Sequence, residues 1–549
     1  MNRHSSLSNS LFVRILYAAI PLLCIGNSSF ASSAIPKDSL AKDFLFFCDK
    51  LESSHPDPYS AFGGKPYFSL ARDMALERIL SDSLSVNGFC DLLNEFIIPL
   101  KDMHTFVNYP NSNEVNEIRY VQRISFNVLN DGLMVAGIAE PYSQYLGSRL
   151  LAINDVPADS LYKRMEKIKP SENRADNMQN LSLWGNQDRI LDRLGVNVNG
   201  NDRVYYQLLT PQADTISLEL PIVEREHIAD VEMARLKSSL NLPKGNLQYD
   251  FIDDKGNVMY LRLSSVMARE NYRYCYDQGW DNARGDIEYH YKSVGKDMPE
   301  NIEEAINAIP SFSEEFYGML TEMKDKGAEY LIIDLRGNGG GWTPITLPSL
   351  MMMFGDDYFS KRFEVKNIRL ISDLYLHKTN QTIEELNRSW GTSMKLGDYL
   401  FMDNDYQGDN IASIRKMMIQ NAMTETPEIL QSLDGKQLYQ PKQIFVITDP
   451  GTFSAAFHYA FYLHKMGATL VGVPSGQAPN TFMEVTPFTL PCSGLSASIS
   501  NTLQQFFPKD SPLAKELIPD VRIMSQDYAR YNLDADTPVL KILDICRGE

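Results

Sequence analysis

The stretch QIFVITDPGTFSAAFHYAFYLHK, Gln443 to Lys465, decides how the rest of the chain is interpreted. Its β-branched and aromatic start predicts a buried strand over Gln443 to Thr448, and Asp-Pro-Gly then ends that strand with a turn. Ser454 follows in the first turn of a predicted helix, where free backbone N–H groups and the helix dipole favour a developing negative charge. It lies off the apolar stripe of that helix, which comprises Phe453, Ala456, Phe457, Ala460 and Phe461. Ser454 is therefore either a nucleophile or an ordinary helix cap.

The composition describes an acidic globular protein of more than one domain. At 549 residues the chain is long enough for two or three domains, and 44% hydrophobic residues suffice for packed cores. Its 70 acidic and 52 basic residues give a net charge of −18. Because nucleic acids and anionic membranes are bound through Lys and Arg, this balance argues against both as partners.

The first 34 residues are typical of an export signal. Basic residues precede the apolar run Ile15 to Ile25, small residues follow it, and cleavage is expected after Ala31 or Ala34. Cys24 suggests lipidation, but Leu23 stands where a lipobox has a small residue. No later apolar run approaches the ~20 residues that span a bilayer. We expect an exported protein, periplasmic or extracellular, with lipoprotein anchoring as the less favoured alternative.

The cysteines do not form a recognisable site. Without the signal there are five, an odd number at wide spacings: Cys48, Cys90, Cys275, Cys492 and Cys546. This pattern indicates neither a disulfide framework nor a zinc site, although Cys48 could pair with Cys90. No H-E-x-x-H or similar ligand spacing occurs, so we expect no metal and no cofactor.

Changes of pattern divide the chain into four segments. Residues 1–34 are the signal peptide, residues 35–112 read as helical, residues 113–225 as short strands, and residues 226–549 as a core in which strands alternate with helices. Such alternation favours β-α-β units on a mostly parallel sheet, hence an α/β fold class.

Three stretches of the chain carry less regular patterns. Glu224 to Lys244 is charged and is expected to be a connecting helix or linker. Glu270 to Lys296 is an aromatic and polar insertion, either a surface excursion or a lid over a site. The stretch from about 355 to 440 is expected to be irregular.

The phrase YLGSRLLAINDVPADSLYKRM, Tyr145 to Met165, resembles the centre of a PDZ domain: a glycine turn, a strand, a tight Asn-Asp turn and a helix. The resemblance implies that this segment captures an extended peptide by strand addition. The alternative is a β-rich spacer without a ligand.

A second signal is IDLRGNGGGW, Ile333 to Trp342, where a buried strand runs directly into four glycines. Such a cluster lets the backbone adopt positive φ and turn N–H groups toward a ligand. It is neither a phosphate-binding Walker loop nor a dinucleotide fingerprint, because no Gly-Lys-Ser/Thr follows and Trp342 occupies the third glycine position. A backbone cradle for an oxyanion is the better interpretation.

Together, DLRGNGGG and the later Thr-Phe-Ser-Ala-Ala resemble the C-terminal processing, or tail-specific, family of serine peptidases, in its tricorn-core-like branch. FTLPCSGLSASIS and LIPDV near the end resemble the closing strands of that family. The resemblance implies a ClpP/crotonase-like β-α spiral core. It also implies that Ser454 attacks a peptide carbonyl and that N–H groups of Gly339 or Gly340 and of Ala455 bind the oxyanion.

The general base departs from the best-known members of this family. They use a lysine in a Thr-x-Gly-Lys segment, whereas VGVPSGQAPN has Gln477 at that point, which has no titratable amine. His104, in KDMHT, matches the histidine of the tricorn-like branch. His458 lies four residues after Ser454 on the same helical face and is the alternative base.

These observations predict an exported serine peptidase that hydrolyses polypeptides through an acyl-enzyme, with Ser454 as nucleophile and His104 as base. The alternative is an inactive family member that binds peptides or hydrophobic ligands. Acyl-CoA chemistry on the related crotonase fold is disfavoured by the export signal and the PDZ-like segment. Four carboxylates are available to orient the base: Asp102, Glu484, Glu516 and Asp520. The sequence leaves the oligomeric state open.

Overall fold

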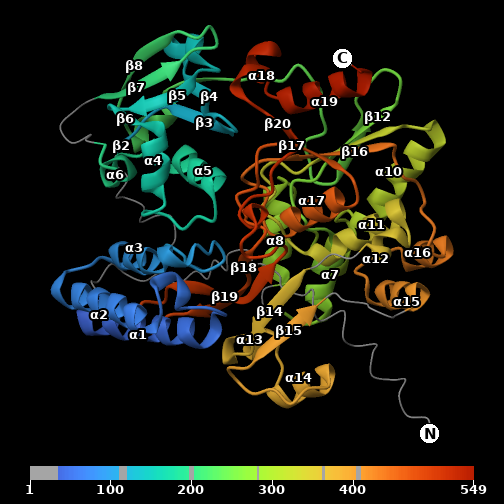
Figure 1. The fold of residues 1–549 in the computed structure, drawn as a ribbon, viewed down its shortest axis with the longest axis horizontal. Coiled ribbons are helices and arrows are strands. Elements are labelled where there is room, and N and C mark those ends of the chain that lie inside the picture. Colours follow the sequence, from blue (N-terminus) through green and yellow to red (C-terminus); the bar gives the residue numbers. More distant parts are fainter. Residues whose placement is uncertain are drawn as a thin grey trace.

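The computed structural model describes residues 35–110, 120–196, 203–280, 283–361, 365–403 and 410–548. Figure 1 shows N-terminal helices (blue), a middle sheet (teal and green) and a larger core that contains most of the remaining chain. The predicted signal peptide lies outside the described residues. Within the described residues, no helix is long and apolar enough to cross a membrane.

Helices form the N-terminal part, as the sequence predicted: α1 (Lys37–Ser54), η1 (Ser60–Phe62), α2 (Lys65–Ser81), α3 (Val86–Ile97) and η2 (Ile98–Leu100). Their apolar faces share one cluster with Leu495, Ala497 and Ile499 from the C-terminal strands. Cys48 and Cys90 are buried in this cluster as free thiols, so the suggested pairing is wrong. The N-terminal helices therefore pack directly on the core.

The middle sheet is antiparallel, with strand order β10-β4-β5-β7-β8, β3 beside β4, and β6 beside β5. Its strands are β3 (Ile124–Leu129), β4 (Gly132–Ala139), β5 (Arg149–Ile153), β6 (Val156–Pro157), β7 (Arg203–Leu209), β8 (Thr215–Pro221) and β10 (Met233–Arg235). The accompanying elements are β2 (Tyr120–Val121), η4 (Glu140–Tyr145), α4 (Ala158–Met165), α5 (Arg174–Trp184), α6 (Asp188–Arg193), β9 (Val223–Glu224) and η5 (Arg225–Asp230).

The segment expected as a connecting helix or linker, Glu224 to Lys244, instead contributes strand β10 to this sheet. β10 pairs with β4 over Gly137 to Ala139, whereas β5 pairs with β4 at Met134. β10 thus covers the part of the β4 edge that β5 leaves unpaired, and an unpaired strand edge is a ready template for such pairing.

The core sheet has the order β11-β12-β13-β16-β17-β20, and every pair from β12 onward is parallel. Its strands are β11 (Gln248–Phe251), β12 (Val258–Arg262), β13 (Tyr330–Asp334), β16 (Gln443–Thr448), β17 (Thr469–Gly472) and β20 (Val521–Arg522). The predicted mostly parallel sheet is confirmed, and β16 has the predicted bounds.

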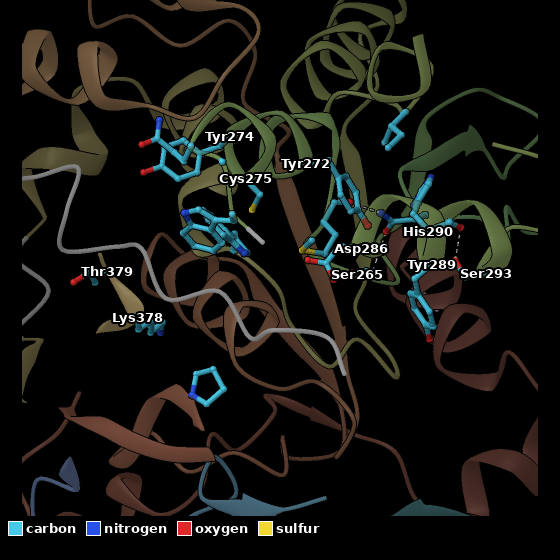
Figure 2. Close-up of a pocket in the computed structure, with 18 of the residues that line it drawn as sticks. Ser265, Tyr272, Tyr274, Cys275, Asp286, Tyr289, His290, Ser293, Lys378 and Thr379 are labelled. Atoms are coloured by element: carbon cyan, nitrogen blue, oxygen red, sulfur yellow. Dashed lines mark hydrogen bonds between the residues drawn. The ribbon is translucent and has the colours of Figure 1, made fainter. Parts of the chain in front are cut away.

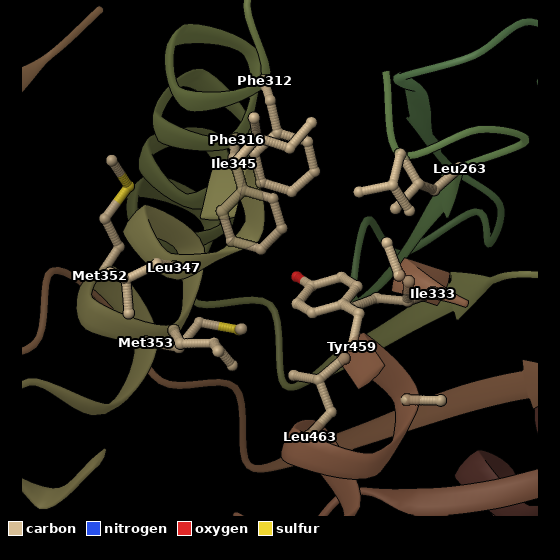
Figure 3. Packing of buried hydrophobic residues seen from close by; sticks show 14 of the residues in the cluster. Leu263, Phe312, Phe316, Ile333, Ile345, Leu347, Met352, Met353, Tyr459 and Leu463 are labelled. Carbon is tan, nitrogen blue, oxygen red and sulfur yellow. The ribbon is translucent and has the colours of Figure 1, made fainter. Parts of the chain in front are cut away.

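Both faces of the core sheet are buried. Because side chains alternate along a strand, Ile333 and Val446 join one apolar cluster while Ile332 and Phe445 join the cluster on the opposite face. Parallel sheets with both faces covered read as continuous apolar runs in sequence. The covering helices on the first face are α10 (Phe312–Lys326), α11 (Leu347–Phe354) and α17 (Ala455–Lys465) (Figure 3). Helices α18 (Ser525–Arg530) and α19 (Thr537–Arg547) follow β20.

A second sheet has the order β1-β19-β14-β15, with β18 also beside β19. Its strands are β1 (Phe106–Val107), β14 (Lys366–Leu370), β15 (Tyr399–Asp403), β18 (Thr481–Thr489) and β19 (Ser496–Gln505). β1 pairs with β19, so the residues just after His104 are tied to the C-terminal part of the chain.

The stretch from 355 to 440 is not irregular, which corrects the expectation. Besides β14 and β15 it contains α12 (Asp357–Ser360), α13 (Asp373–Lys378), α14 (Ile383–Trp390), α15 (Ile411–Asn421) and α16 (Pro427–Leu433). These elements are short and gain their stability from packing, for example on Leu386 and Leu400, rather than from a long amphipathic pattern.

The aromatic insertion after β12 is helical. It forms α7 (Arg269–Asp277) and α8 (Ala283–Ser293), and α9 (Ile302–Asn307) follows before α10. The carboxylate of Glu270 accepts the N–H of Phe312 at 3.0 Å, which joins α7 to the start of α10. The insertion is therefore packed onto the core.

Candidate active site

Ser454 occupies a strained turn between β16 and α17. It is the N-cap of α17 with φ 53° and ψ −122°, and positive φ is unfavourable for a residue with a side chain. Its side chain makes no capping hydrogen bond, so the ordinary cap interpretation does not apply. Its carbonyl accepts the N–H of His458 at 3.0 Å, and the N–H of the preceding Phe453 donates to Asn338 O at 2.9 Å. The hydroxyl is thus left available at the beginning of a helix.

Gln477 holds the backbone of Ser454. Its Oε1 atom accepts the N–H of Ser454 at 2.5 Å, and Gln477 is fully buried. The loop around it is fixed as well, because Ser475 Oγ accepts the N–H of Gln477 and donates to Thr452 O. Sequence reasoning treated Gln477 only as a missing base and did not identify this contact.

The glycine loop lies directly against Ser454. A Cβ added to Gly340, which has φ 108°, would lie 2.7 Å from Ser454 Cβ. The N–H of Gly340 donates to Asn338 Oδ1 at 2.9 Å, so this predicted oxyanion donor is already used. No hydrogen bond joins the N–H of Gly339 or Ala455 to another described residue. These two groups therefore remain as donors for an oxyanion.

His104 is buried beside the same turn. Its ring lies 5.0 Å from the ring of Phe453, measured between centroids, and only 3% of the residue is exposed. Neither ring nitrogen has a hydrogen-bond partner of good geometry in the described part of the chain, although the backbone of Phe482 lies close enough to raise the pKa of the ring. Burial lowers the pKa of His104, although the Asp102 carboxylate opposes that shift. At neutral pH the ring is therefore neutral and can accept a proton.

Asp102 fixes the segment that carries His104. Its Oδ1 atom accepts the N–H of His104 at 2.8 Å, and Oδ2 accepts the Thr105 hydroxyl at 2.5 Å. His55 Nε2 lies 3.3 Å from Oδ2. Burial alone would raise the pKa of Asp102, but the contact with His55 and the neighbouring charges outweigh it and hold the pKa below its usual value. Asp102 is therefore ionised and orients the backbone next to His104.

Glu172, from the middle sheet region, is an acid that sequence reasoning missed. Oε2 of Glu172 accepts the N–H of Ala478 at 2.8 Å and Oε1 accepts the N–H of Met103 at 3.4 Å. One oxygen each of Asp102 and Glu172 and one ring nitrogen of His104 lie within 4.8 Å of one another. Glu172 thus joins the segment that carries His104 to the loop that carries Gln477.

Two other candidate acids are engaged elsewhere. Glu484 forms a buried ion pair with Arg369, and Asp520 Oδ2 accepts the N–H of Leu470 at 2.8 Å. The charge of Glu484 nevertheless raises the pKa of His104, so this carboxylate lies near the ring without bonding to it.

His458 is not suited to be the base, which corrects the alternative prediction. Its Nδ1 atom bonds to Thr343 Oγ1 at 2.8 Å and its Nε2 atom to Gln504 Oε1 at 2.7 Å. Both ring nitrogens are therefore occupied, and burial lowers the pKa of His458 to about 4. The i+4 argument failed because Ser454 precedes the helix with non-helical backbone angles, and because Thr343 and Gln504 hold the ring.

Trp342, the residue that follows the glycine loop, borders a cavity of about 2010 Å³, part of whose lining is shown in Figure 2. Trp342 and residues of the aromatic insertion line it, including Tyr274 and Trp280. Backbone hydrogen bonds connect the glycine loop with this lining, because the N–H of Val266 donates to Gly340 O and the N–H of Trp342 donates to Val266 O, both at 2.9 Å. Ser454 and His104 are not among the lining residues.

Comparison with protein families and solved structures gives a consistent picture. Residues 305–523 match the model of Peptidase family S41. No curated protein sequence matches the chain.

The fold resembles that of mature CPAF complexed with lactacystin, with 14% identity over 93% of this chain and 99% of that chain and a TM-score of 0.51. A CPAF mutant gives 15% identity over 90% and 95% of the two chains, with a TM-score of 0.52. The photosystem II D1 C-terminal processing protease gives 14% identity over 91% and 99% of the two chains, with a TM-score of 0.36.

Proposed function

Because residues 305–523 of this chain belong to peptidase family S41, a family of serine peptidases, we propose that Ser454 is the nucleophile and His104 the general base of an exported peptidase. The observation that carries the proposal is the backbone of Ser454. A non-glycine residue at φ 53°, with an uncapped hydroxyl at a helix N-terminus, is strained, and such strain clusters at functional sites.

The reaction follows from the groups around Ser454. Its Oγ forms a bond to the carbonyl carbon of a peptide while His104 accepts the hydroxyl proton. The N–H groups of Gly339 and Ala455 bind the resulting oxyanion. His104 then gives its proton to the leaving amine as the C–N bond breaks. A water molecule, deprotonated by His104, next attacks the carbon of the acyl-enzyme; the bond from that carbon to Ser454 Oγ breaks, His104 returns the proton to Oγ, and the product leaves as a free carboxylate.

Gln477 has a different role from the lysine that it replaces. Its amide cannot take a proton, but its oxygen holds the N–H of Ser454. We propose that Gln477 positions the nucleophile and that His104 alone carries the proton.

The remaining parts keep the roles suggested by their sequences. Residues 1–34 would direct export, and the middle sheet would act as a PDZ-like module that receives an extended substrate segment. The core would be a ClpP/crotonase-like spiral. The second candidate function, peptide binding without catalysis, is favoured only by Gln477 at the position of the family's lysine.

Labelling with a fluorophosphonate, read by intact mass and peptide mapping, separates the two functions. We expect one adduct, on Ser454, and cleavage of an unfolded polypeptide such as reduced casein. Both should disappear in Ser454→Ala and persist in Ser360→Ala, which changes an exposed serine. A wild-type protein that neither reacts nor cleaves, while it still binds unfolded polypeptide, would establish the binding function instead.

A further inference from the structure

The cavity beside the glycine loop has a strongly aromatic lining. Tyr274 and Trp280 are half-buried and cover the buried ring of Trp342, with ring centroids 5.6 Å and 5.5 Å from it, so these two rings face the cavity. Tyr289, which also lines the cavity, is 50% exposed. Figure 2 shows Tyr274 and Tyr289 on different sides of the same hollow. Aromatic faces of this kind bind side chains of a polypeptide through large apolar contacts with little loss of side-chain entropy.

The charges around this cavity have the opposite sign to the protein as a whole. The chain carries a net charge of −18, yet the Lys and Arg side chains of the lining outnumber its carboxylates. The cations are Lys244, Lys296, Lys378 and Arg388, and the carboxylates are Asp286 and Glu385. Lys378 interacts with the charge of the buried Glu484, whereas Lys244, Lys296 and Arg388 form no ion pair with a described carboxylate. The charges of these three are therefore available to a ligand.

Lys378 is the cation set deepest in the wall. Its Nζ atom donates to Val485 O at 2.8 Å, and burial lowers its pKa to about 8. The amine therefore remains mainly protonated at neutral pH. Figure 2 shows Lys378 across the cavity from Tyr289 and His290. The cavity thus offers positive charge on its walls around an aromatic lining.

We infer that this cavity binds an acidic stretch of the polypeptide substrate that contains an aromatic residue. Carboxylates of the stretch face Lys296, Lys378 and Arg388, while its aromatic side chain packs against the tryptophan and tyrosine rings. Because the protein carries a net charge of −18, acidic chains are repelled elsewhere and are attracted to the cations of this cavity. This inference rests on the proposed peptidase function, because it treats the bound polypeptide as a substrate. The binding itself does not require catalysis.

Peptide binding to the full mature Ser454→Ala protein tests the inference without cleavage. The probe is a fluorescent peptide of about 12 residues with a central Tyr flanked by Glu, compared with peptides that carry Gln or Lys in place of Glu, or Ala in place of Tyr. At about 50 mM salt we expect the Glu peptide to bind roughly 10-fold more tightly than the Gln peptide, and the difference to shrink at about 500 mM salt. Ala in place of Tyr should weaken binding about 5-fold.

Paired variants assign the effect to the cavity. Lys296→Gln with Arg388→Gln, two exposed positions, should remove most of the preference for Glu. The matched control, Lys436→Gln with Lys509→Gln, changes the net charge equally at exposed positions outside the cavity and should keep the preference. Equal affinity for the Glu and Gln peptides, or an equal loss in both double variants, overturns the inference.

Cleavage assays separate this inference from the proposed function. If the Glu preference is present but the wild-type protein cleaves nothing, the cavity assignment stands and the peptidase proposal fails. If the wild-type protein cleaves casein without the Glu preference, the peptidase proposal stands and the cavity assignment fails.

Discussion

The amide oxygen of Gln477 accepts a hydrogen bond of 2.5 Å from the backbone N–H of Ser454. Ser454 is held at φ 53°, and this bond is one of the contacts that stabilise the strained turn. Gln477, at the lysine position, thus holds the backbone of Ser454, the proposed nucleophile, and cannot take its proton.

Replacing Gln477 therefore tests positioning. In Gln477→Ala the N–H of Ser454 loses its buried acceptor, a loss of about 1–3 kcal/mol, and kcat should fall roughly 10- to 100-fold. Gln477→Lys should be no better, because an ammonium group cannot accept a hydrogen bond. Steady-state kinetics with a quenched peptide measures both. A gain of activity in Gln477→Lys would contradict the assignment of His104 as the base.

Alanine substitutions of His104 and His458 should have clearly different effects on kcat. His104→Ala should lower kcat about 10³-fold or more because it removes the proton acceptor, and should also lower the melting temperature because it truncates a buried side chain. His458→Ala should leave kcat within about 10-fold but lower the melting temperature, because Thr343 and Gln504 each lose a buried partner. The reverse pattern would make His458 the base.

The increase of kcat/KM with pH, the acid limb of the profile, should occur at a lower pH than is usual for a histidine base. Only neutral His104 accepts a proton, and burial lowers its pKa, so kcat/KM should rise to its plateau below the usual histidine pKa of about 6.5. Asp102 raises the pKa of His104, so Asp102→Asn should move the limb to still lower pH. A profile of kcat/KM between about pH 4 and 8 measures this. A limb that moves to higher pH in Asp102→Asn would contradict it.

His458 should make the fold sensitive to acid. Its folded pKa of about 4 lies below the unfolded value of about 6.5, so the unfolded chain binds the proton more tightly. The free energy of unfolding is unaffected above the unfolded pKa and falls as the pH drops from about 6.5 to 4, by about 3 kcal/mol in all. Urea unfolding of the wild type and His458→Gln across this range should show a shallower pH dependence in the variant. The same pH dependence of the free energy of unfolding in both proteins would refute the attribution of this acid sensitivity to His458.

The glycine loop offers a matched pair of substitutions. In Gly340→Ala the new Cβ meets Ser454 Cβ at 2.7 Å in a backbone conformation that favours glycine, so kcat should fall at least about 100-fold. The Cβ in Gly339→Ala meets nothing within 4 Å, and its N–H remains, so kcat should change less than about 5-fold. Equal losses in the two variants would show that the close approach to Ser454 does not matter.

Local sequence signals explain what could be predicted. The bounds of β16, Gln443–Thr448, follow from an apolar run and a turn that lie next to each other in the chain. The close approach of Gly340 to Ser454 agrees with the prediction of a glycine loop, since only glycine fits there. The mostly parallel core sheet likewise follows from the alternation of strands and helices.

The features that were missed depend on contacts between distant segments. The bond from Ser454 to Gln477, the two partners of His458, and the bridge made by Glu172 join residues that no periodicity connects. The use of the Gly340 N–H by Asn338 is local, but it depends on a side-chain rotamer that spacing does not reveal. The short helices between residues 355 and 440 were not predicted from the sequence, because packing rather than intrinsic helix propensity stabilises them.

At this site an early segment of the chain, at Thr105, is bonded to a late one, at Ser500, which has a consequence for biosynthesis. Thr105 Oγ1 accepts the N–H of Ser500, 395 residues later, and β1 pairs only with the late strand β19 within the described residues. A growing or truncated chain that lacks β19 cannot hold His104 beside Phe453. With His104 as the proposed base, hydrolysis therefore requires the C-terminal strand β19, and a chain that lacks this strand is expected to be inactive.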